Sequence, residues 1–216
     1  CNISLRLQEN EKVIDYAIEV LNNATENNDK AFANFLLGNA YTSKGDNNKA
    51  LEYFKKALAI QLKTFGPEHP QIGLTYNSIG LVYSHTGEYD KANEYYEKSL
   101  TIALKAFGPE HLQVATSYNN MGFAYVKKGE YDKAVENHEK ALRIGVKALG
   151  SEHDEVALSY HNIGSVCLKK GEYDTAIAYH ERAVRIWLEA LEPDHPRIAS
   201  AYLGTGAAYA GTGACG

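Results

Sequence analysis

The sequence predicts an all-α solenoid of stacked helical hairpins. The first observation is a strict repeat: Gly-Pro-Glu-His at residues 66–69 returns in the same or a closely similar form at 108, 150 and 192. The second is the spacing of apolar residues inside each repeat, which lie three or four apart as on one face of a helix. The third is the placement of glycine between these apolar segments, with no proline inside them. A fixed period of 42 residues with this pattern is typical of a repeat architecture.

The repeat divides the chain into consecutive frames. Two half repeats flank four full ones: a degenerate half repeat with one B-type helix at 1–23, full repeats at 24–65, 66–107, 108–149 and 150–191, and a half repeat with one A-type helix at 192–216. We expect one continuous solenoid domain with ten helices. Here A names the first helix of a repeat and B the second.

The frame 108–149 shows why each half is expected to be a helix. Its first half places one apolar stripe on the A helix, made of Ala115, Tyr118, Met121, Gly122 and Tyr125. Its second half repeats the spacing on the B helix at Ala134, Ala141, Leu142 and Ile144, and leaves Glu136, Glu139, Lys140 and Arg143 for solvent. Each frame is therefore expected to be an antiparallel helical hairpin.

Small residues mark the ends and contacts of these helices. Gly129 and its equivalents Gly87 and Gly171 precede Glu-Tyr-Asp, so we expect a left-handed glycine to end the A helix and the aspartate to cap the B helix. Pro70 and Pro196 fit the first turn of an A helix. A further set of glycines is expected to let A and B approach closely by facing alanines: Gly38, Gly80, Gly122 and Gly164, with Gly206 in the last frame.

Composition excludes several functions. The 216 residues carry 22 Lys and Arg against 27 Asp and Glu, a net charge of −5, so nucleic acid is not expected as a partner. No run approaches the roughly 18 apolar residues of a membrane span, so no membrane partner is expected.

Cys1, Cys167 and Cys215 are an odd number without CxxC spacing, which favours a reducing, cytoplasmic setting. The first residues show neither an initiator Met nor a signal peptide, and we expect the chain to be a piece of a longer protein.

The same residues resemble the tetratricopeptide repeat. Repeat 108–149 supplies Tyr118, Met121-Gly122, Tyr125, Ala134 and Ala141 at that signature's offsets, while His138 and His180 stand where Phe54 and Tyr96 supply its later aromatic residue. The usual repeat has about 34 residues. The longer period and the Gly-Pro-Glu-His-Pro connector are similar to the 42-residue, kinesin light chain-like class. The resemblance implies a right-handed superhelix with the A helices on its concave wall.

That resemblance also implies a peptide-binding groove beside the buried stripe of the A helices. The candidate groove residues are Asn77, Ser78, Leu81, His85, Asn119, Asn120, Phe123, Lys127, His161, Asn162 and Lys169. Asparagine offers a donor and an acceptor to the main chain of an extended peptide. Apolar and basic neighbours suit an aromatic-acidic motif, a kind of ligand that kinesin light chains bind. The alternative is that these asparagines bond neighbouring helices or solvent.

Metal binding and catalysis are not expected. His69, His111, His153 and His195 recur in the connectors, but equivalent positions of stacked helices lie too far apart to share one ion, so they are expected to fix the turns. No nucleotide-binding or hydrolase motif is present, and no cofactor is implied. Cys167 occupies a slot filled elsewhere by tyrosine and reads as a buried small residue.

Three functions remain open. The leading prediction is a non-enzymatic protein-interaction scaffold that binds a partner peptide in the groove. One alternative is a sensor or regulatory arm of a larger signalling NTPase. The other is a self-stacking array, because the B-type stripe of Val13, Ile14, Ala17, Ile18 and Leu21 and the charge-free A helix at 201–209 are complementary.

Overall fold

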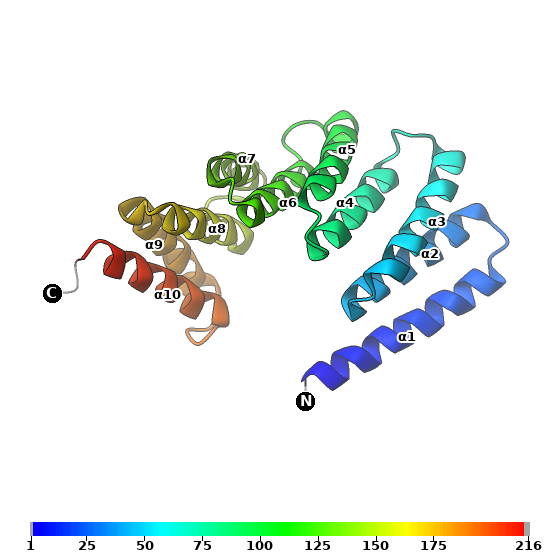
Figure 1. Cartoon of the computed structure of the whole chain (residues 1–216), viewed down its shortest axis with the longest axis horizontal. Helices are drawn as coiled ribbons and strands as arrows, with labels where there is room; N and C mark the ends of the chain where they lie inside the picture. The colour runs from blue at the N-terminus through cyan, green and yellow to red at the C-terminus, as the bar shows by residue number, and fades with distance from the viewer. Residues whose placement is uncertain (1, 214–216) are drawn as a thin grey trace. The chain divides into compact units, whose positions relative to one another are not determined.

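The computed structural model describes the backbone of residues 2–213 and the side chains of residues 10–213 (Figure 1). Within this range it contains ten α-helices and no strand, as the sequence predicts. The helices are α1 (Asn2–Asn23), α2 (Asn27–Lys44), α3 (Asn47–Phe65), α4 (Pro70–His85), α5 (Tyr89–Phe107), α6 (Leu112–Lys128), α7 (Tyr131–Leu149), α8 (Asp154–Lys170), α9 (Tyr173–Ala190) and α10 (Pro196–Gly211). The fold class, an all-α repeat solenoid, is confirmed.

The contacts divide the chain into two compact units, residues 1–106 and 107–216. In the first unit α2 and α3 pack as a hairpin, α1 lies against α2, and α4 lies against α3 and touches α2. In the second unit α6–α7 and α8–α9 are hairpins, α7 packs on α8, and α10 contacts both α9 and α8. The boundary falls at the end of the repeat 66–107. One continuous domain with the stated frames stays a prediction.

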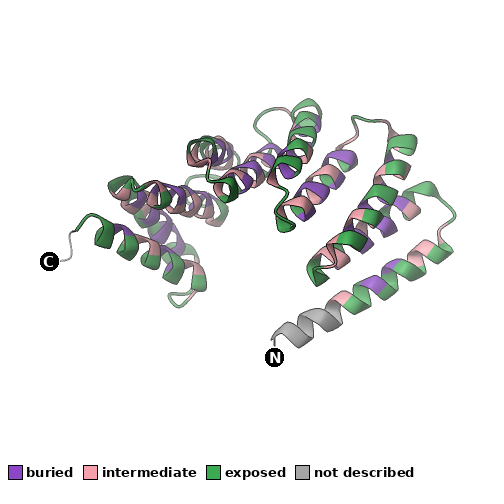
Figure 2. Ribbon diagram, in the orientation of Figure 1, coloured by how far each residue is buried: buried purple, intermediate pink, exposed green. Residues whose placement is uncertain are grey.

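Each core follows the apolar stripes, which Figure 2 shows as buried faces turned toward neighbouring helices. The predicted glycine contacts lie there, but they differ in kind from the prediction. A Cβ added at Gly38 would lie 2.6 Å from the Phe54 ring, and one at Gly122 would lie 2.8 Å from His138 Cε1. The glycines therefore accommodate the large ring of the B helix rather than simply facing an alanine. The sequence pattern identified the close contact between the A and B helices correctly. The residue that fills it is the ring four residues after the expected alanine of the B helix.

The glycine ends are confirmed for α6 and α8, whereas Gly87, with φ of 81°, follows Thr86, the cap residue of α4. The aspartate caps are wrong. Gly129 and Gly171 have φ of 78° and 79° and close α6 and α8. Asp132 lies inside the first turn of α7, because that helix already begins at Tyr131 and has Glu130 at its cap position. Asp90 and Asp174 occupy the same place in α5 and α9. Their carboxylates still suit the positive end of the helix dipole.

The connector histidines are the N-caps of four A helices. The Nδ1 of His69 accepts a hydrogen bond from the backbone N–H of Gln71 at 3.3 Å, and the other three make the same bond two residues on. These three are His111, His153 and His195, each at 3.2 Å. The histidines therefore fix the turns through a hydrogen bond, because a side-chain acceptor at the N-cap satisfies a backbone N–H that has no partner within the helix.

Candidate peptide-binding surfaces

The predicted groove residues all lie on A helices, and the two units hold separate sets of them. Asn77, Ser78, Leu81 and His85 lie on α4 in the first unit. Asn119, Asn120, Phe123 and Lys127 lie on α6, and His161, Asn162 and Lys169 on α8, in the second unit. Whether either set binds a ligand stays a prediction.

Asn119 is turned partly into its own hairpin. Its Oδ1 lies 3.1 Å from Nδ1 of His138, a residue of α7 that is 2% exposed. Burial lowers the pKa of His138 to about 4, so the ring is neutral near pH 7 and its Nδ1–H donates to the amide oxygen. Asn119 thus bonds a neighbouring helix, which is the role that the sequence analysis gave as the alternative to peptide binding.

The next repeat replaces this pair by two histidines. His161 takes the position of Asn119 and His180 that of His138, and their ring centroids are 5.0 Å apart. His180 is fully buried, and neither of its ring nitrogens has a hydrogen-bond partner in the part of the chain described. Burial, together with the electrostatic repulsion that would arise if both His161 and His180 were protonated, lowers the pKa of His180 to about 4. The pair is consequently held neutral, and His161 faces the core more than a groove.

The long side chains among the predicted residues reach solvent. Phe123 is 54% exposed and the Lys127 ammonium lies 5.4 Å from its ring centroid, a cation–π arrangement. Lys169 is also exposed near the end of α8. Leu81 and His85 are exposed on α4 of the first unit. The A helices of the second unit thus expose the Phe123 ring with the Lys127 ammonium above it, and separately the basic Lys169.

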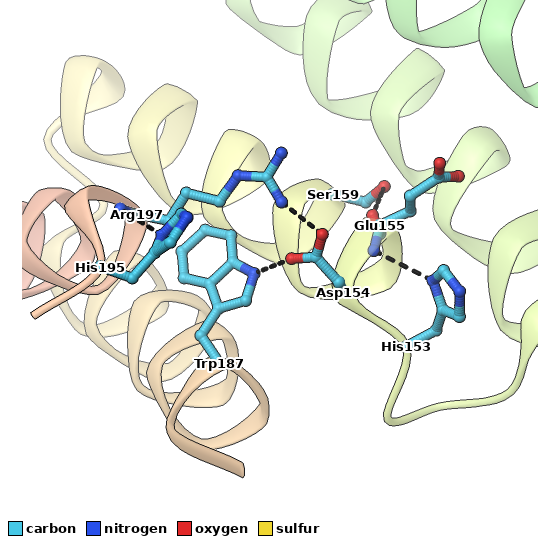
Figure 3. Close-up of polar contacts among 7 residues, drawn as sticks. All are labelled: His153, Asp154, Glu155, Ser159, Trp187, His195 and Arg197. Atoms are coloured by element: carbon cyan, nitrogen blue, oxygen red, sulfur yellow. Dashed lines mark hydrogen bonds and ion pairs between the residues drawn. The ribbon is translucent and has the colours of Figure 1, made fainter. Parts of the chain in front are cut away.

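A second feature, which the sequence analysis missed, closes the cleft between α8 and α10 (Figure 3). Trp187 of α9 is fully buried there and its Nε1 donates a 2.6 Å hydrogen bond to Asp154. Arg197 of α10 forms an ion pair with the other oxygen of Asp154. Partial burial opposes ionisation, but these two donors hold the pKa of Asp154 below its ordinary value. One carboxylate thus binds an indole and a guanidinium together.

The equivalent cleft of the first unit, between α2 and α4, is open. It has a volume of about 280 Å³ and is lined by Asn28, Asp29, Phe32, Phe35, Gln61, Gln71 and Leu74. Phe32 is 54% exposed and Leu74 is 44% exposed. The signal that could have revealed both clefts is the one position where the B helices differ most: Gln61 stands in the first repeat where Trp187 stands three repeats later.

No arrangement in the described residues resembles a metal or nucleophile site. Residues 10–213 contain no group of three or more His, Cys, Asp or Glu side chains placed to hold an ion. Burial raises the pKa of the Cys167 thiol to about 11, which leaves it protonated and unreactive. Cys1 and Cys215 lie outside the described residues. None of the described helices has the length and apolar character required to cross a membrane.

The fold defines an α-helical repeat protein. The tetratricopeptide repeat family matches four overlapping stretches, 29–105, 74–145, 113–186 and 155–215. The chain therefore belongs to the tetratricopeptide repeat family, and the recognition from sequence is confirmed. No curated protein matches the sequence.

Solved structures similar to the chain include kinesin light chain-like proteins. BtubC (BKLC) from P. vanneervenii has a TM-score of 0.79 at 22% identity, over 99% of this chain and 85% of that one. The nearly identical TPR-like repeats from Podosopora anserina, assigned to a kinesin light chain, give 0.75 at 26%, over 89% and 90%. The apo form of RapI gives 0.71 at 24%, over 82% and 62%. The first and third likenesses are to the fold alone.

Proposed function

We propose that the chain is a non-catalytic scaffold that binds a segment of a partner protein on the exposed face of its A helices. The observation that carries this proposal is Phe123, a half-exposed ring of α6 with the Lys127 ammonium above it. Aromatic residues are enriched in protein–protein interfaces relative to the rest of the surface. Tetratricopeptide repeat proteins bind protein partners, and the family is generally non-catalytic. A cytoplasmic setting accords with this proposal.

The partner segment would combine an aromatic with an acidic residue. An aromatic side chain would pack on Phe123, and a carboxylate would meet Lys127 and Lys169, the basic groups of this surface. Amide groups of the predicted groove asparagines, such as that of Asn162, would hold the main chain of the segment. The same surface would serve a regulatory arm of a signalling NTPase.

A binding titration with matched variants tests this proposal. The probe is an acetylated peptide with tryptophan between two glutamates, measured by NMR shifts of the ¹⁵N-labelled protein. Phe123→Ala should weaken binding roughly tenfold, since an aromatic pair contributes about 0.5–1.5 kcal/mol in addition to the free energy of burying its apolar surface. Lys127→Gln with Lys169→Gln should weaken it and remove its salt dependence. Glu136→Gln with Arg143→Gln, on the exposed face of α7, is the control.

Equal weakening by the α7 control would place the site on the B helices and refute the proposal. An affinity of the Phe123→Ala variant for the peptide equal to that of the wild type would also refute the proposal. Asn162→Ala adds a finer measurement, and circular dichroism checks that each variant keeps its helices. Asn119→Ala is less informative than it appeared from sequence, because it also removes the hydrogen bond to His138.

Head-to-tail self-association is a second candidate, favoured by one observation on α10. A Cβ at Gly206 would meet nothing within 4 Å, whereas the equivalent Gly164 faces the His180 ring of its own B helix. Beside it, Leu203 is 75% exposed and Tyr202 54% exposed. We propose that α1 of a second copy, which exposes Val13, covers this face as a B helix would.

Sedimentation velocity over a wide concentration range tests the association. Wild-type protein should show a concentration-dependent increase in sedimentation coefficient, and Leu203→Lys should abolish it by placing a charge in the contact. Phe123→Lys, a matched change at an exposed ring, should leave the association unchanged. A monomer at hundreds of micromolar would refute the proposal.

A further inference from the structure

The open cleft between α2 and α4 lacks the side chain that fills its repeat counterpart. Gln61 corresponds to Trp187, three repeats or 126 residues later. Its amide is fixed at the floor of the cleft, because Oε1 accepts a 2.7 Å hydrogen bond from Oγ1 of Thr75. Trp187, in contrast, reaches Asp154 with its ring nitrogen. The shorter glutamine leaves a hollow where an indole stands in the other unit.

The rim of this hollow is apolar and accessible. Phe32 and Leu74 are 54% and 44% exposed, and Phe35 lies behind them against Phe54, with ring centroids 5.7 Å apart. At about 280 Å³ the hollow is at the lower limit of small-ligand pockets, roughly 300–1,000 Å³. It therefore has room for one large side chain rather than for a cofactor.

The charge at the cleft is negative and unpaired. The ion pair that closes the other cleft is absent, since Asn28 and Gln71 stand where Asp154 and Arg197 form it. Asp29 lines the cleft and also an adjoining hollow that contains Glu19. No Lys or Arg lines either hollow. A carboxylate at an apolar rim favours a ligand that brings its own cation.

We propose that the α2–α4 cleft is a binding site for an aromatic side chain of a partner protein, tryptophan best of all, that is followed by Lys or Arg. The ring takes the place that Trp187 occupies between α8 and α10. The cation meets Asp29 much as Arg197 meets Asp154. The chain thus contains, in its second unit, an internal copy of the complex that its first unit forms with a partner. This site does not depend on the Phe123 surface, which has the opposite charge.

The experiment uses an acetylated tetrapeptide, Gly-Trp-Arg-Gly-amide, added to the ¹⁵N-labelled 216-residue chain. We expect saturable NMR shifts centred on Phe32, Leu74 and Thr75, with a dissociation constant on the order of 1 mM, as befits one anchoring ring. The peptide with Ala in place of Trp should not bind. The peptide with Glu in place of Arg should bind roughly tenfold more weakly, and high salt should reduce that difference.

Three variants locate the site. Gln61→Trp should abolish peptide binding by filling the cleft from inside, as Trp187 does. Phe32→Ala, at an exposed position where folding is not at stake, should weaken binding roughly tenfold. Asp29→Asn should weaken binding of the Arg peptide about threefold to fivefold, and it should leave binding of the Glu peptide unchanged or slightly stronger because a repulsive charge is removed. Thr116→Ala, the equivalent of Phe32 on α6, is the control and should change nothing.

The contrary results are equally clear. Absence of saturable shifts at several millimolar peptide would overturn the proposal, and so would wild-type affinity in both Phe32→Ala and Gln61→Trp. Tighter binding of the Glu peptide than of the Arg peptide at these residues would overturn the assignment of the ligand. Phe123→Ala should leave this titration unchanged, so failure here and failure of the proposed scaffold surface are distinguishable.

Discussion

The two units are built on the same repeat but place different chemistry in its two central slots. Beneath the A-helix glycine, the first unit places Phe54 and Tyr96, whereas the second places His138 and His180. In the cleft between α2 and α4 the first unit has Gln61, and in the cleft between α8 and α10 the second unit has Trp187. The backbone geometry tolerates each exchange, because a glycine notch accepts any flat ring of similar size.

In these two clefts, one side chain of the B helix distinguishes a junction that is filled from within from a junction that is open. The α8–α10 cleft is filled from within by Trp187 and closed by the ion pair of Asp154 with Arg197. The α2–α4 cleft has neither feature and exposes Phe32. A repeat protein can thus vary its binding surfaces at the B helix without altering the helices that form them.

The largest effect is expected from opening the closed cleft. Trp187→Gln gives the second unit the residue of the first and should lower the free energy of unfolding by roughly 3–5 kcal/mol, the usual cost of removing a buried Trp. Urea denaturation followed by circular dichroism measures it. Leu188→Gln, at a residue 46% exposed beside it, is the control and should cost less than about 1 kcal/mol. Equal costs would show that Trp187 is not the closing residue.

Acid should destabilise the second unit more than the first. The pKa of His180 is about 4 in the folded chain and about 6.5 in the unfolded chain. The unfolded state therefore binds the proton first, and stability is lost as the pH falls from about 6.5 to 4. The loss is on the order of 3 kcal/mol at pH 4, with a similar amount from His138.

Variants that copy the first unit test this pH dependence. His138→Tyr with His180→Tyr should reduce the change in the free energy of unfolding between pH 7 and pH 4. Only the change that comes from titration of the carboxylates should remain. Urea denaturation at a series of pH values provides the measurement. A slope unchanged by both substitutions would mean that these histidines do not titrate on unfolding.

The smallest effect concerns the glycine notch itself. Gly122→Ala should destabilise by about 1–3 kcal/mol, because the added Cβ would lie 2.8 Å from His138. Gly206→Ala has open space and should instead stabilise α10 by roughly 0.5–1 kcal/mol, since alanine favours a helix interior over glycine. Thermal melting of the two variants checks the opposite signs. A loss of stability in Gly206→Ala would show that its face is covered.

Most of the fold could be predicted from the sequence because the same pattern of apolar residues and glycines recurs in each repeat. Ten helices, the glycine ends at Gly129 and Gly171 and the burial of Cys167 follow from local pattern and period, and the structure confirms them. The aspartate caps failed for a local reason: Asp132 satisfies the cap preference, yet the helix starts one residue before it. Sequence spacing alone does not fix a helix boundary to one residue.

The surfaces were less readable because they arise where repeats differ. Asn119 was expected in the groove, but its partner His138 lies on another helix, and only the structure brings the two within 3.1 Å. Asp154, Trp187 and Arg197 lie on three helices and span 43 residues of sequence, so no local sequence motif predicts their contact. Comparing aligned repeats position by position, rather than seeking what they share, would have pointed to Gln61 and Trp187.

The solitary tryptophan also makes the chain its own optical reporter. Trp187 is the only indole in the sequence, and it lies sealed between α8 and α10. Its emission therefore observes one junction of the second unit, whereas the sixteen tyrosines are spread over both units. Unfolding followed at the two wavelengths would separate the two units within one unlabelled molecule. A partner carrying tryptophan into the first unit would add a second emitter there, distinguishable from the resident one by its accessibility to a soluble quencher.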